Sequence, residues 1–403
     1  MSSAQMDQAV LVLNAGSSSL KFNLYQGTAE LLKGQVEGIG STAMRLKAQR
    51  PSDGTRLDAT LEAPAGAASV TGHEAALAAV LGLIREAFEG LRISAAGHRV
   101  VHGGIGFEAP AVIDDSVMAE LERLVPLAPL HQPHNLAGIR AAQKAFPDAL
   151  QVACFDTAFH RNHPWVNDAF ALPLPLYDEG VRRYGFHGLS YEYITQHLAE
   201  TAPEAAKGRL IVAHLGNGAS MCAIEDGRSI GSTMGFTALD GLPMGTRCGQ
   251  LDPGVLLYLM QEKGMSAESI SDLLYKQSGL KGLSGLSQDM RELEAAGTDA
   301  ARKAIDYFTF RVRREAGAMA AILNGVDTIV FTGGIGEHAV NVRRDVCTPL
   351  GWLGVELDED ANATSARIIS TPASRVTVMV VPTNEEEMIR RHTVTALGAE
   401  GKR

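Results

Sequence analysis

Several short stretches of the chain alternate apolar and polar positions with a period of two, which predicts β-strands. These stretches cover residues 10–13, 21–25, 94–101, 151–155, 210–214, 220–224, 327–332 and 376–381. In other stretches the apolar positions recur every three or four residues, which predicts helices over residues 74–88, 115–125, 133–146, 191–199, 252–263 and 300–324. Hairpins mixed with strand–helix crossovers indicate an α/β chain.

Two segments, one in each half of the chain, share the local pattern of a strand, a polar turn and a second strand. The first is VLVLNAGSSSLKFNLY, residues 10–25, and the second is LIVAHLGNGASMCAIEDGRSI, residues 210–230. Such an echo suggests a duplicated domain with a cleft between the two copies. The length of 403 residues also favours two domains, and we expect the first core to end near Phe155.

The bulk composition narrows the range of partners. A formal net charge of -10 argues against a nucleic-acid or anionic-membrane surface, so an anionic ligand must be met by a local cluster of cations. The four cysteines are widely separated and form no C-x-x-C pair, so neither a disulfide framework nor a zinc knuckle is indicated. The first residues lack the layout of a signal peptide, and the longest apolar helical run, residues 75–84, is too short for a bilayer. We therefore expect a cytoplasmic protein.

Glycine- and serine-rich turns follow apolar strands at three places, residues 14–19, 214–220 and 332–337. Backbone N–H groups in such a turn form a nest for an anion, and hydroxyl groups add further donors. Lys21 would add a positive charge beside the first turn. A plain polar turn explains the first segment equally well when it is taken alone, and no P-loop motif occurs. The recurrence favours a set of phosphate and sugar contacts for one nucleotide.

The third turn also fits a different interpretation. Residues 334–339 satisfy G-x-G-x-x-[GA], and Glu356 and Asp358 follow at about the distance that a dinucleotide-binding fingerprint requires. A lone match of this kind is a frequent false positive, and it explains neither of the earlier turns. An NAD-dependent dehydrogenase stays open as an alternative that rests on this motif alone.

Two arginines and two histidines are candidates for chemistry. Arg99 ends a predicted strand and Arg247 lies in a glycine-flanked loop. A buried guanidinium needs a fixed anionic partner, which could be an internal carboxylate or a ligand, and the sequence leaves both open. His131 and His187 lie among Gly, Pro and aromatic residues, where a histidine is either a half-buried donor or part of a site.

Two other kinds of site find little support. His98 and His102 have the i, i+4 spacing of helical metal ligands, but they lie in a predicted strand, where such side chains do not converge. No G-x-S-x-G motif is present, and GLSG at residues 282–285 misses the pattern of a triad hydrolase.

Nine segments spread over nearly the whole chain together resemble the acetate kinase family of the acetate and sugar kinase, Hsc70 and actin superfamily. In family order they are NAGSSSLKF, GHRVVHGG, APLHQPHN, FDTAFH, RRYGFHGLS, HLGNGAS, GSTMGFTALDGLPMGTRCGQLDPG, FTGGIGEH and TNEEEMI. The resemblance implies duplicated ribonuclease H-like domains of the actin-like ATPase type, with a nucleotide cleft between them. It implies an acyl-kinase domain of residues 1–155 with 390–403, whose C-terminal helix packs back, and a nucleotide-binding domain of residues 156–389.

The reaction implied by the resemblance is a reversible, Mg²⁺-dependent phosphoryl transfer from ATP to acetate, giving acetyl phosphate and ADP. The enzyme would be a phosphotransferase with a carboxyl group as acceptor, serving acetyl-CoA biosynthesis. A carboxylate is already ionised at neutral pH, since carboxyl pKa values lie near ~4, so no general base is needed. The difficulty is the meeting of two anions, which positioning and cationic stabilisation of an in-line transfer would overcome. A site of Arg and His suits that task.

The resemblance also assigns roles to individual residues. The catalytic group comprises Asp156, Arg99, Arg247, His187 and His131, with His187 and Arg247 as the transition-state stabilisers. The ATP-binding group comprises Ser17, Ser19, Lys21, His214, Gly216, Asn217, Gly218, Asp289, Met290, Arg291, Gly334, Ile335 and His338. Asn14 and Glu385 would hold Mg²⁺, or Mn²⁺, largely together with water and phosphate.

The acyl pocket implied by the resemblance is small and apolar. Arg99 would bind the carboxylate, while Val101, Leu130 and Phe186 close around the methyl group. This chain has Ala238 where the family commonly has proline, which leaves propionate or butyrate as an alternative acceptor. One methylene is worth only ~1–3 kcal/mol in such a pocket.

Two further departures are Gln250, where an acidic residue is frequent, and His338, where asparagine is usual. The expected ligands are ATP or ADP and acetate or acetyl phosphate, in a homodimer without nucleic-acid or membrane partners. Besides the dehydrogenase, a nucleotide switch of the actin or Hsc70 kind stays open, although it gives Arg99 and Arg247 no task.

Overall fold

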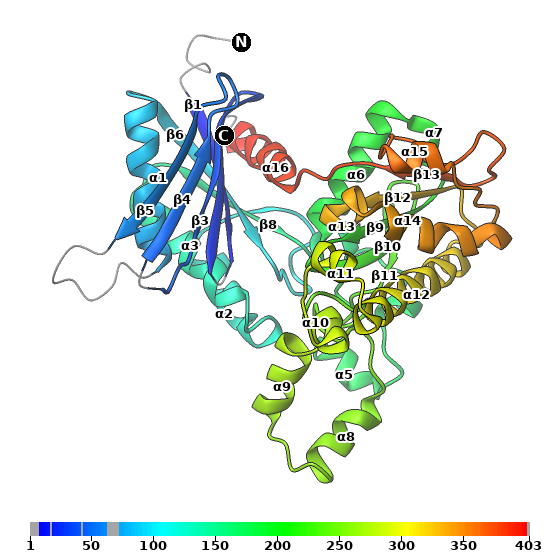
Figure 1. Cartoon of the computed structure of the whole chain (residues 1–403). Helices are drawn as coiled ribbons and strands as arrows, with labels where there is room; N and C mark the ends of the chain where they lie inside the picture. The colour runs from blue at the N-terminus through cyan, green and yellow to red at the C-terminus, as the bar shows by residue number, and fades with distance from the viewer. Residues whose placement is uncertain (1–7, 17, 42, 63–71, 401–403) are drawn as a thin grey trace. The chain divides into compact units, whose positions relative to one another are not determined.

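The structure is a computed structural model, and it describes residues 8–16, 18–41, 43–62 and 72–400. The described chain falls into two compact units (Figure 1). Unit 1 combines Met1–Ala158 with Asn384–Arg403, and unit 2 is Phe159–Thr383, so the division lies close to the predicted domain boundaries, which themselves stay a prediction. A short 3-10 turn, η3 (Ala158–His160), spans the junction in the chain.

Unit 1 is built on a mixed sheet. Its strands are β1 (Gln8–Ala15), β2 (Ser19–Gln26), β3 (Ala29–Glu37), β4 (Ala43–Gln49), β5 (Arg56–Glu62), β6 (Arg92–Val100), β7 (Ala111–Val112) and β8 (Leu150–Phe155). They lie in the order β5-β4-β3-β2-β1-β6-β8-β7. Its helices are α1 (His73–Ala87), α2 (Asp115–Arg123), η2 (Val125–Leu127), α3 (Gln132–Ala145) and α16 (Glu385–Glu400).

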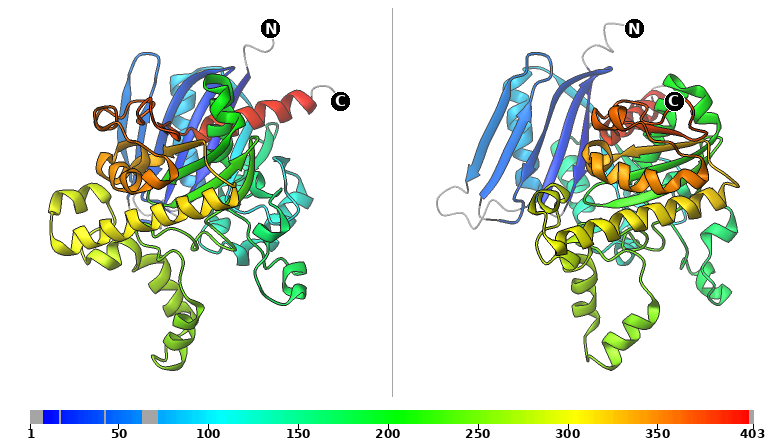
Figure 2. Two further views of the ribbon diagram at one scale, coloured as in Figure 1. Left: turned by 90° about the vertical axis from the view of Figure 1, so that its right-hand side faces the viewer. Right: turned by 45° about the vertical axis from the view of Figure 1, so that its right-hand side comes forward.

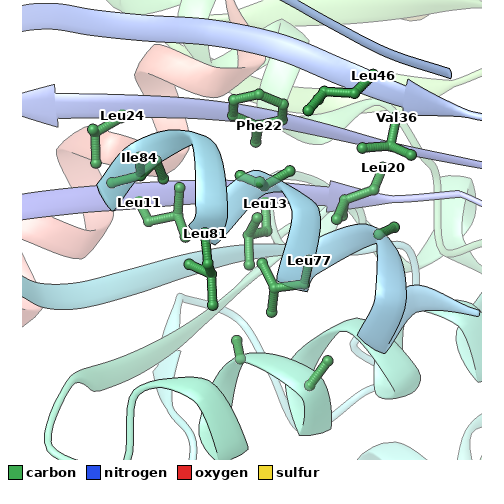
Figure 3. Packing of buried hydrophobic residues seen from close by; sticks show 14 of the residues in the cluster. Leu11, Leu13, Leu20, Phe22, Leu24, Val36, Leu46, Leu77, Leu81 and Ile84 are labelled. Atoms are coloured by element: carbon green, nitrogen blue, oxygen red, sulfur yellow. The ribbon is translucent and has the colours of Figure 1, made fainter. Parts of the chain in front are cut away.

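The two faces of the β1–β2 region carry different layers. Leu11 and Leu13 of β1 pack with Phe22 of β2 against the apolar side of α1, which includes Leu77 (Figure 3). The opposite face receives α16, because a Cβ at Gly97 of β6 would lie 2.1 Å from Thr393 Oγ1 of that helix. Helix α16, from the end of the described chain, therefore packs on the sheet that contains the first strand.

Unit 2 is built on a smaller sheet. Its strands are β9 (Arg209–Leu215), β10 (Ala219–Glu225), β11 (Arg228–Ser232), β12 (Thr328–Thr332) and β13 (Thr377–Val380), in the order β11-β10-β9-β12-β13. Its helices are α4 (Trp165–Asp168), α5 (Leu174–Asp178), α6 (Gly188–Thr201), α7 (Pro203–Lys207), α8 (Pro253–Gln261), α9 (Ala267–Lys276), α10 (Gly279–Ser284), α11 (Met290–Ala296), α12 (Asp299–Ile322), α13 (Gly333–His338), α14 (Val340–Cys347), η4 (Thr348–Leu353) and α15 (Glu359–Ala363).

Helices cover the sheet of unit 2 as well. Tyr191, Ile194 and Leu198 on one side of α6 pack against Leu210 and Val212 of β9. The long helix α12 contacts β9, β10 and β11, and it runs along the sheet in both views of Figure 2. No helix in the described ranges is both long and apolar enough to cross a membrane.

The two sheets share one topology. In unit 1, β1, β6 and β8 run parallel, and the hairpin β1–β2 is continued by β3. In unit 2, β9, β12 and β13 run parallel, and the hairpin β9–β10 is continued by β11. This repeat confirms the α/β class and the duplication predicted from the two similar segments, while the cleft between the copies stays a prediction.

Candidate active site

Three predicted site residues lie at the carboxyl ends of neighbouring parallel strands in unit 1. Asn14 is near the end of β1, Arg99 near the end of β6, and Asp156 directly follows β8. Parallel strands bring such ends to one edge of a sheet, where ligands commonly bind in α/β proteins. Glu385 joins them as the first residue of α16, so residues far apart in sequence meet at one sheet edge.

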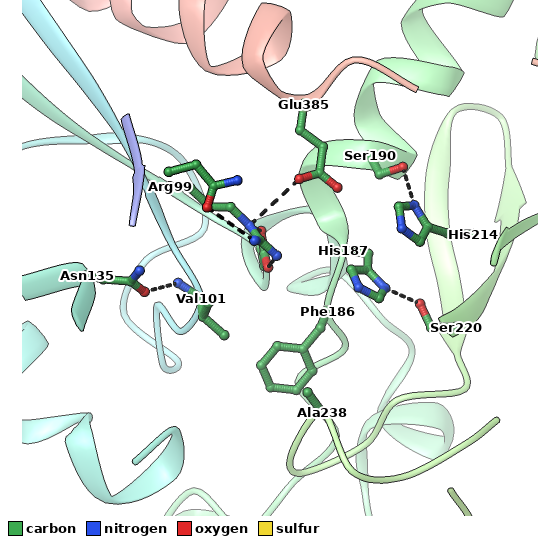
Figure 4. A network of polar contacts seen from close by, with 12 residues as sticks. Arg99, Val101, Asn135, Phe186, His187, Ser190, His214, Ser220, Ala238 and Glu385 are labelled. Carbon is green, nitrogen blue, oxygen red and sulfur yellow. Dashed lines mark hydrogen bonds and ion pairs between the residues drawn. The ribbon is translucent and has the colours of Figure 1, made fainter. Parts of the chain in front are cut away.

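Arg99 is the centre of this cluster. Its Nε and Nη2 donate to the two carboxylate oxygens of Asp156 at 3.0 and 2.6 Å, and its Nη1 donates to Asn14 Oδ1 at 3.4 Å. Its Nε also lies 3.8 Å from Glu385 Oε2, as a dashed line in Figure 4 marks. The internal acid that the sequence left open as a partner for Arg99 is therefore Asp156, itself a predicted catalytic residue.

Burial controls the charges of this cluster. It raises the pKa of Glu385 to about 7, against the lowering effect of Arg99 and with a further rise from Asp156. Burial alone would lower the pKa of Arg99, but Asp156 and Glu385 together hold it above its ordinary value. The guanidinium is thus a permanent cation, whereas Glu385 is an acid that gains from a nearby positive charge.

The first hairpin contributes to the same face of the sheet. Lys21 of β2 is the register partner of Asn14, and its charge lowers the pKa of Glu385. Gly16 N donates to Ser19 O at 2.8 Å, which closes the turn. Ser17 lies outside the described residues. The predicted phosphate hairpin and the Arg99 cluster are therefore neighbours within unit 1.

The predicted acyl-pocket residues of unit 1 lie around the start of α3. Val101 N donates to Asn135 Oδ1 at 3.0 Å, and Asn135 Nδ2 donates to Ala15 O at 2.7 Å, which ties the segment after β6 to the end of β1. Val101 is buried, Leu130 is exposed, and His131 stands at the N-cap of α3.

In unit 2, His187 precedes α6 in a left-handed conformation, with φ 58°. Its Nδ1 lies 2.8 Å from Ser220 Oγ, and the ring stacks on His214 with a centroid distance of 4.3 Å. His214 Nδ1 lies 2.8 Å from Ser190 Oγ; Figure 4 shows both hydroxyl contacts. The predicted residues His187 and His214 are thus brought together, and Phe186 next to them is buried.

Arg247 lies in a loop that backbone contacts hold in place. Its Nη1 donates to Ala238 O at 3.0 Å and lies 3.5 Å from Met244 Sδ. Gly245 N donates to Asn217 O at 3.2 Å, which links this loop to the turn between β9 and β10. Ala238, which stands where the family commonly has proline, therefore contacts the predicted catalytic residue Arg247 through its backbone carbonyl.

A pocket of about 530 Å³ in unit 2 unites most of the predicted ATP-binding residues. It is formed by the turn after β9, the start of α11 and the short helix α13. The predicted residues that line it are Gly216, Asn217, Asp289, Met290, Arg291, Gly334, Ile335 and His338. Its volume suits a small-molecule ligand of nucleotide size.

The same pocket contains residues that the sequence did not indicate. Gln288, Glu294 and Ala339 also line it. Gln288 and Glu294 belong to no glycine-rich turn or resembling motif, and Ala339 entered only as the last position of the G-x-G-x-x-[GA] match. The expected turn at residues 332–337 instead falls mostly in helix α13, which directly follows β12.

The dinucleotide interpretation of this segment is not supported. Asp358, one of the two acids that it needs, accepts a hydrogen bond from Ala361 N at 3.0 Å and caps α15. The sheet also contains the antiparallel strands β10 and β11 beside β9, unlike the mostly parallel sheet of a dinucleotide-binding fold.

The atoms available to coordinate a metal ion at the candidate site are oxygens. Among the described residues no group of three or more His, Cys, Asp or Glu side chains could hold a metal. Asn14 and Glu385 both lie at the Arg99 cluster, and an amide and a carboxylate oxygen fit Mg²⁺, which keeps several waters and substrate phosphates as ligands.

Comparisons with known proteins agree along the whole chain. Residues 9–391 match the model described as the Acetokinase family. An acetate kinase of Methylocella silvestris is 56% identical over 97% of this chain and 98% of its own length. The crystal structure of Porphyromonas gingivalis acetate kinase is similar with a TM-score of 0.87 and 40% identity, covering 97% of this chain and 100% of that one.

A propionate kinase from Francisella tularensis is structurally similar too. Its TM-score is 0.90 at 37% identity, and the match covers 96% of this chain and 99% of that one. The full-length match to the family model and the high identity to its members lead to one assignment. This chain belongs to the acetokinase family of kinases, which transfer a phosphoryl group from ATP to a carboxylate.

Proposed function

We propose that this chain catalyses the reversible transfer of the γ-phosphoryl group of ATP to acetate, giving acetyl phosphate and ADP. The observation that supports this most is the cluster of Asn14, Arg99, Asp156 and Glu385 at one sheet edge of unit 1. In a member of the acetokinase family, this cluster offers a fixed cation to a carboxylate and oxygen donors to a metal.

Arg99 and Asp156 act as a unit in this proposal. The bidentate bond to Asp156 fixes the plane of the Arg99 guanidinium. Acetate is already ionised at neutral pH, so Asp156 has no proton to remove and serves to orient Arg99 beside the acceptor. His131 lines the same acceptor site at the start of α3.

Arg247 and His187 are the proposed donors to the transferring phosphoryl group. Charge in that transition state is spread over the equatorial oxygens, so a guanidinium and an imidazole N–H stabilise it directly. The proposal requires residues of both units to act on the same pair of substrates.

Asn14 and Glu385 are the proposed holders of Mg²⁺, with Mn²⁺ as a substitute. The ion would neutralise charge on the ATP phosphates. The raised pKa of Glu385 supports this role, because a buried carboxylate next to one shared arginine gains from a further cation.

We assign ATP binding to the β1–β2 hairpin of unit 1 and to the 530 Å³ pocket of unit 2. Ser17, Ser19 and Lys21 would contact phosphate, and His214 with the turn 216–218 would do so from unit 2. The pocket lined by Asp289, Met290 and Arg291 on one side and α13 on the other would hold the adenosine.

Propionate or butyrate is the alternative acceptor. Ala238 offers a smaller side chain than the proline common in the family, and the similar structure from Francisella tularensis is titled a propionate kinase. Val101, Leu130 and Phe186 would line the acyl pocket in either case.

We also propose a homodimer in the cytoplasm. Helix α8 buries none of its side chains, and Val255, Leu257, Tyr258 and Met260 on it are exposed apolar residues. We propose a second copy of the chain as the occupant of this apolar face. Sedimentation should give twice the chain mass. Three of the four cysteines are buried and none of the four forms a disulfide, which suits a reducing compartment.

Trapping with hydroxylamine tests the activity directly. Wild-type protein with ATP, MgCl₂ and acetate should form acetyl hydroxamate, and chelation of the metal should abolish the product. Equal assays with propionate and butyrate separate the acceptors, and the largest kcat/KM identifies the preferred acid. Absence of hydroxamate from all three acids would overturn the proposal.

A further inference from the structure

The ring of His187 is supported within unit 2 by two hydroxyl groups in series. His187 Nδ1 lies 2.8 Å from Ser220 Oγ, and that oxygen is in turn in contact with the hydroxyl of Tyr191. Ser220 and Tyr191 are both fully buried. Neither residue belongs to the set that the sequence indicated.

The local fold brings these groups together. Tyr191 lies one helical turn after His187, and Tyr191 N donates to His187 O at 3.1 Å. Ser220 lies on β10 opposite His214 of β9, the residue on which the His187 ring stacks. Helix α6 therefore directs His187 and Tyr191 onto the same strand hydroxyl.

The other side of the ring faces the glycine turn. A Cβ at Gly218 would lie 3.3 Å from His187 Nε2, so this ring nitrogen borders the turn between β9 and β10. The turn also borders the proposed nucleotide pocket through Gly216 and Asn217. Nδ1 thus faces the buried hydroxyl groups, and Nε2 faces the turn that borders the proposed nucleotide pocket.

We propose that Tyr191 and Ser220 are positioning residues that hold the proton of neutral His187 on Nε2. A phenol is a stronger donor and a weaker acceptor than an aliphatic hydroxyl, so Tyr191 donates to Ser220. Ser220 then directs its own proton to Nδ1, which makes Nδ1 the acceptor and leaves Nε2–H as the donor. The tautomer of a histidine is set in this way by the hydrogen bond of its other nitrogen.

This inference rests on the proposed function, in which His187 donates to the transferring phosphoryl group. A neutral Nε2–H donates without prior proton uptake. It also adds no positive charge to a ring that stacks on another imidazole at 4.3 Å. The relay, which consists of the Tyr191 and Ser220 hydroxyl groups, thus gives His187 an Nε2–H donor that does not depend on protonation of the ring.

Nitrogen NMR of protein labelled with ¹⁵N in histidine tests the proton position without any assay of activity. The His187 signals are assigned by their loss in His187→Gln. In wild-type protein at pH 8, Nε2 should carry the proton and Nδ1 should show the shift of an acceptor. In Ser220→Ala and in Tyr191→Phe, the signals should move toward a mixture of the two tautomers.

Kinetics provide the second readout, with Tyr193→Phe as the control that removes a tyrosine hydroxyl from the same helix. Loss of one neutral hydrogen bond of about 1 kcal/mol corresponds to roughly fivefold in rate. We expect kcat to fall by about that factor in Tyr191→Phe and by more in Ser220→Ala, with both KM values within twofold. Tyr193→Phe should keep the wild-type kcat.

A proton on Nδ1 in wild-type protein would overturn the inference. Unchanged His187 signals in a folded Tyr191→Phe variant would overturn it as well, even if the variant were less stable. A wild-type protein that forms no acyl phosphate but shows Nε2–H with the expected response in the variants would contradict the proposed function and leave the relay intact.

Discussion

At the scale of single residues, the Arg99 cluster shows how one cation is shared between two carboxylates and an amide. Asp156 accepts hydrogen bonds from two guanidinium nitrogens of Arg99, while Asn14 and Glu385 lie within 3.8 Å of the same guanidinium. A buried ion pair contributes little net stability but fixes geometry, because removal of one partner leaves an uncompensated charge. The arrangement therefore suits an arginine that must present one orientation to a ligand.

The first prediction concerns the protonation of Glu385 in metal-free protein. Its folded-state pKa is raised from 4.5 to about 7, so folding favours the protonated acid. That contribution is fully present below pH 4.5 and is lost as the pH rises to about 7, an amount of roughly 3 kcal/mol. Relative to Glu385→Gln, wild-type protein should therefore lose unfolding free energy between pH 4.5 and pH 8.

Urea unfolding of both proteins in EDTA at pH 5 and pH 8 checks this difference. The comparison isolates Glu385, because all other titrating groups are common to the two proteins. The prediction would be contradicted if the difference in unfolding free energy between wild-type protein and Glu385→Gln were the same at pH 5 and pH 8.

At this scale the resemblance named the residues of the Arg99 cluster, whereas other residues of the candidate site were not indicated, for a common reason. Asn14, Arg99, Asp156 and Glu385 lie in motifs, so the resemblance named them. Gln288 and Tyr191 were missed because a pocket wall or a buried hydroxyl contact arises from tertiary packing. Ser220 lies in the motif HLGNGAS, but the motif does not reveal that its hydroxyl contacts His187 and Tyr191.

At the scale of elements, α13 is a short helix that is held at both ends. Glu337 Oε1 accepts from Gly333 N at 2.9 Å at the start of the helix. The fully buried Arg343 donates to Gly336 O and Glu337 O at its end, and to Asn362 O at 2.9 Å. One wall of the proposed adenosine pocket thus depends on contacts outside the pocket.

The second prediction compares two adjacent glycines at the start of α13. Gly333 has φ +76°, and a Cβ there would lie 2.8 Å from Leu215 O, whereas a Cβ at Gly334 meets nothing within 4 Å. Gly333→Ala should lower the unfolding free energy by about 2 kcal/mol or more, from strain and overpacking. Gly334→Ala is the matched control and should change it by less than about 0.5 kcal/mol. Equal effects in thermal or urea unfolding would argue against this account.

The third prediction concerns Arg343. Arg343→Lys keeps the charge but loses the fork of donors that holds the carbonyls of α13. The KM for ATP should rise by about fivefold or more, with the KM for acetate unchanged, if the loss is about one hydrogen bond. Arg344→Lys, on the exposed neighbour, is the control and should leave both KM values as they are. A parallel rise of both KM values in Arg343→Lys would contradict the specific role of α13.

Helices and strands with strong periodicity were predicted to within a few residues, including α12, β9 and β12. The expected turn at residues 332–337 proved to be mostly helical. Strands β3, β4 and β5 were missed, because their outer faces carry Lys, Glu, Gln and Arg among the apolar positions. Whether these segments form strands depends on the neighbouring strands with which they pair. Local sequence propensity does not identify those neighbours.

At the scale of the whole molecule, the duplication was readable from two hairpins and became certain only through the order of the strands. The shared sequence β3-β2-β1-β6-β8 and β11-β10-β9-β12-β13 depends on long-range pairing. No local pattern reveals that β6 lies beside β1, or that α16 returns to the first sheet. The resemblance, rather than periodicity, supplied this part of the prediction.

The fourth prediction is a loss of stability in mild acid. Burial lowers the pKa of His98 and His160 to about 4 and that of His163 to about 2. Between pH 6.5 and pH 4 the unfolded chain therefore binds protons that the folded chain excludes, so the unfolding free energy falls as the pH falls. Each histidine contributes up to about 1.4 kcal/mol per pH unit in this window.

Calorimetry or urea unfolding at pH 7, 6 and 5 measures this slope. His98→Gln removes one of the three groups and should make the slope shallower below pH 6.5. An equal slope in His98→Gln and in wild-type protein from pH 6.5 to pH 5 would show that the His98 imidazole does not stay neutral in the folded protein.

The central claim is that Arg99 of unit 1 and Arg247 of unit 2 serve one phosphoryl transfer to a carboxylate. The most direct measurement is the rate of acetyl hydroxamate formation by Arg99→Ala and Arg247→Ala, with the exposed Arg56→Ala and Arg228→Ala as controls. We predict a loss of about 100-fold or more in each test variant, as expected when a transition-state donor is removed, with folded protein and normal rates in the controls. Near-wild-type rates in both Arg99→Ala and Arg247→Ala would contradict the account.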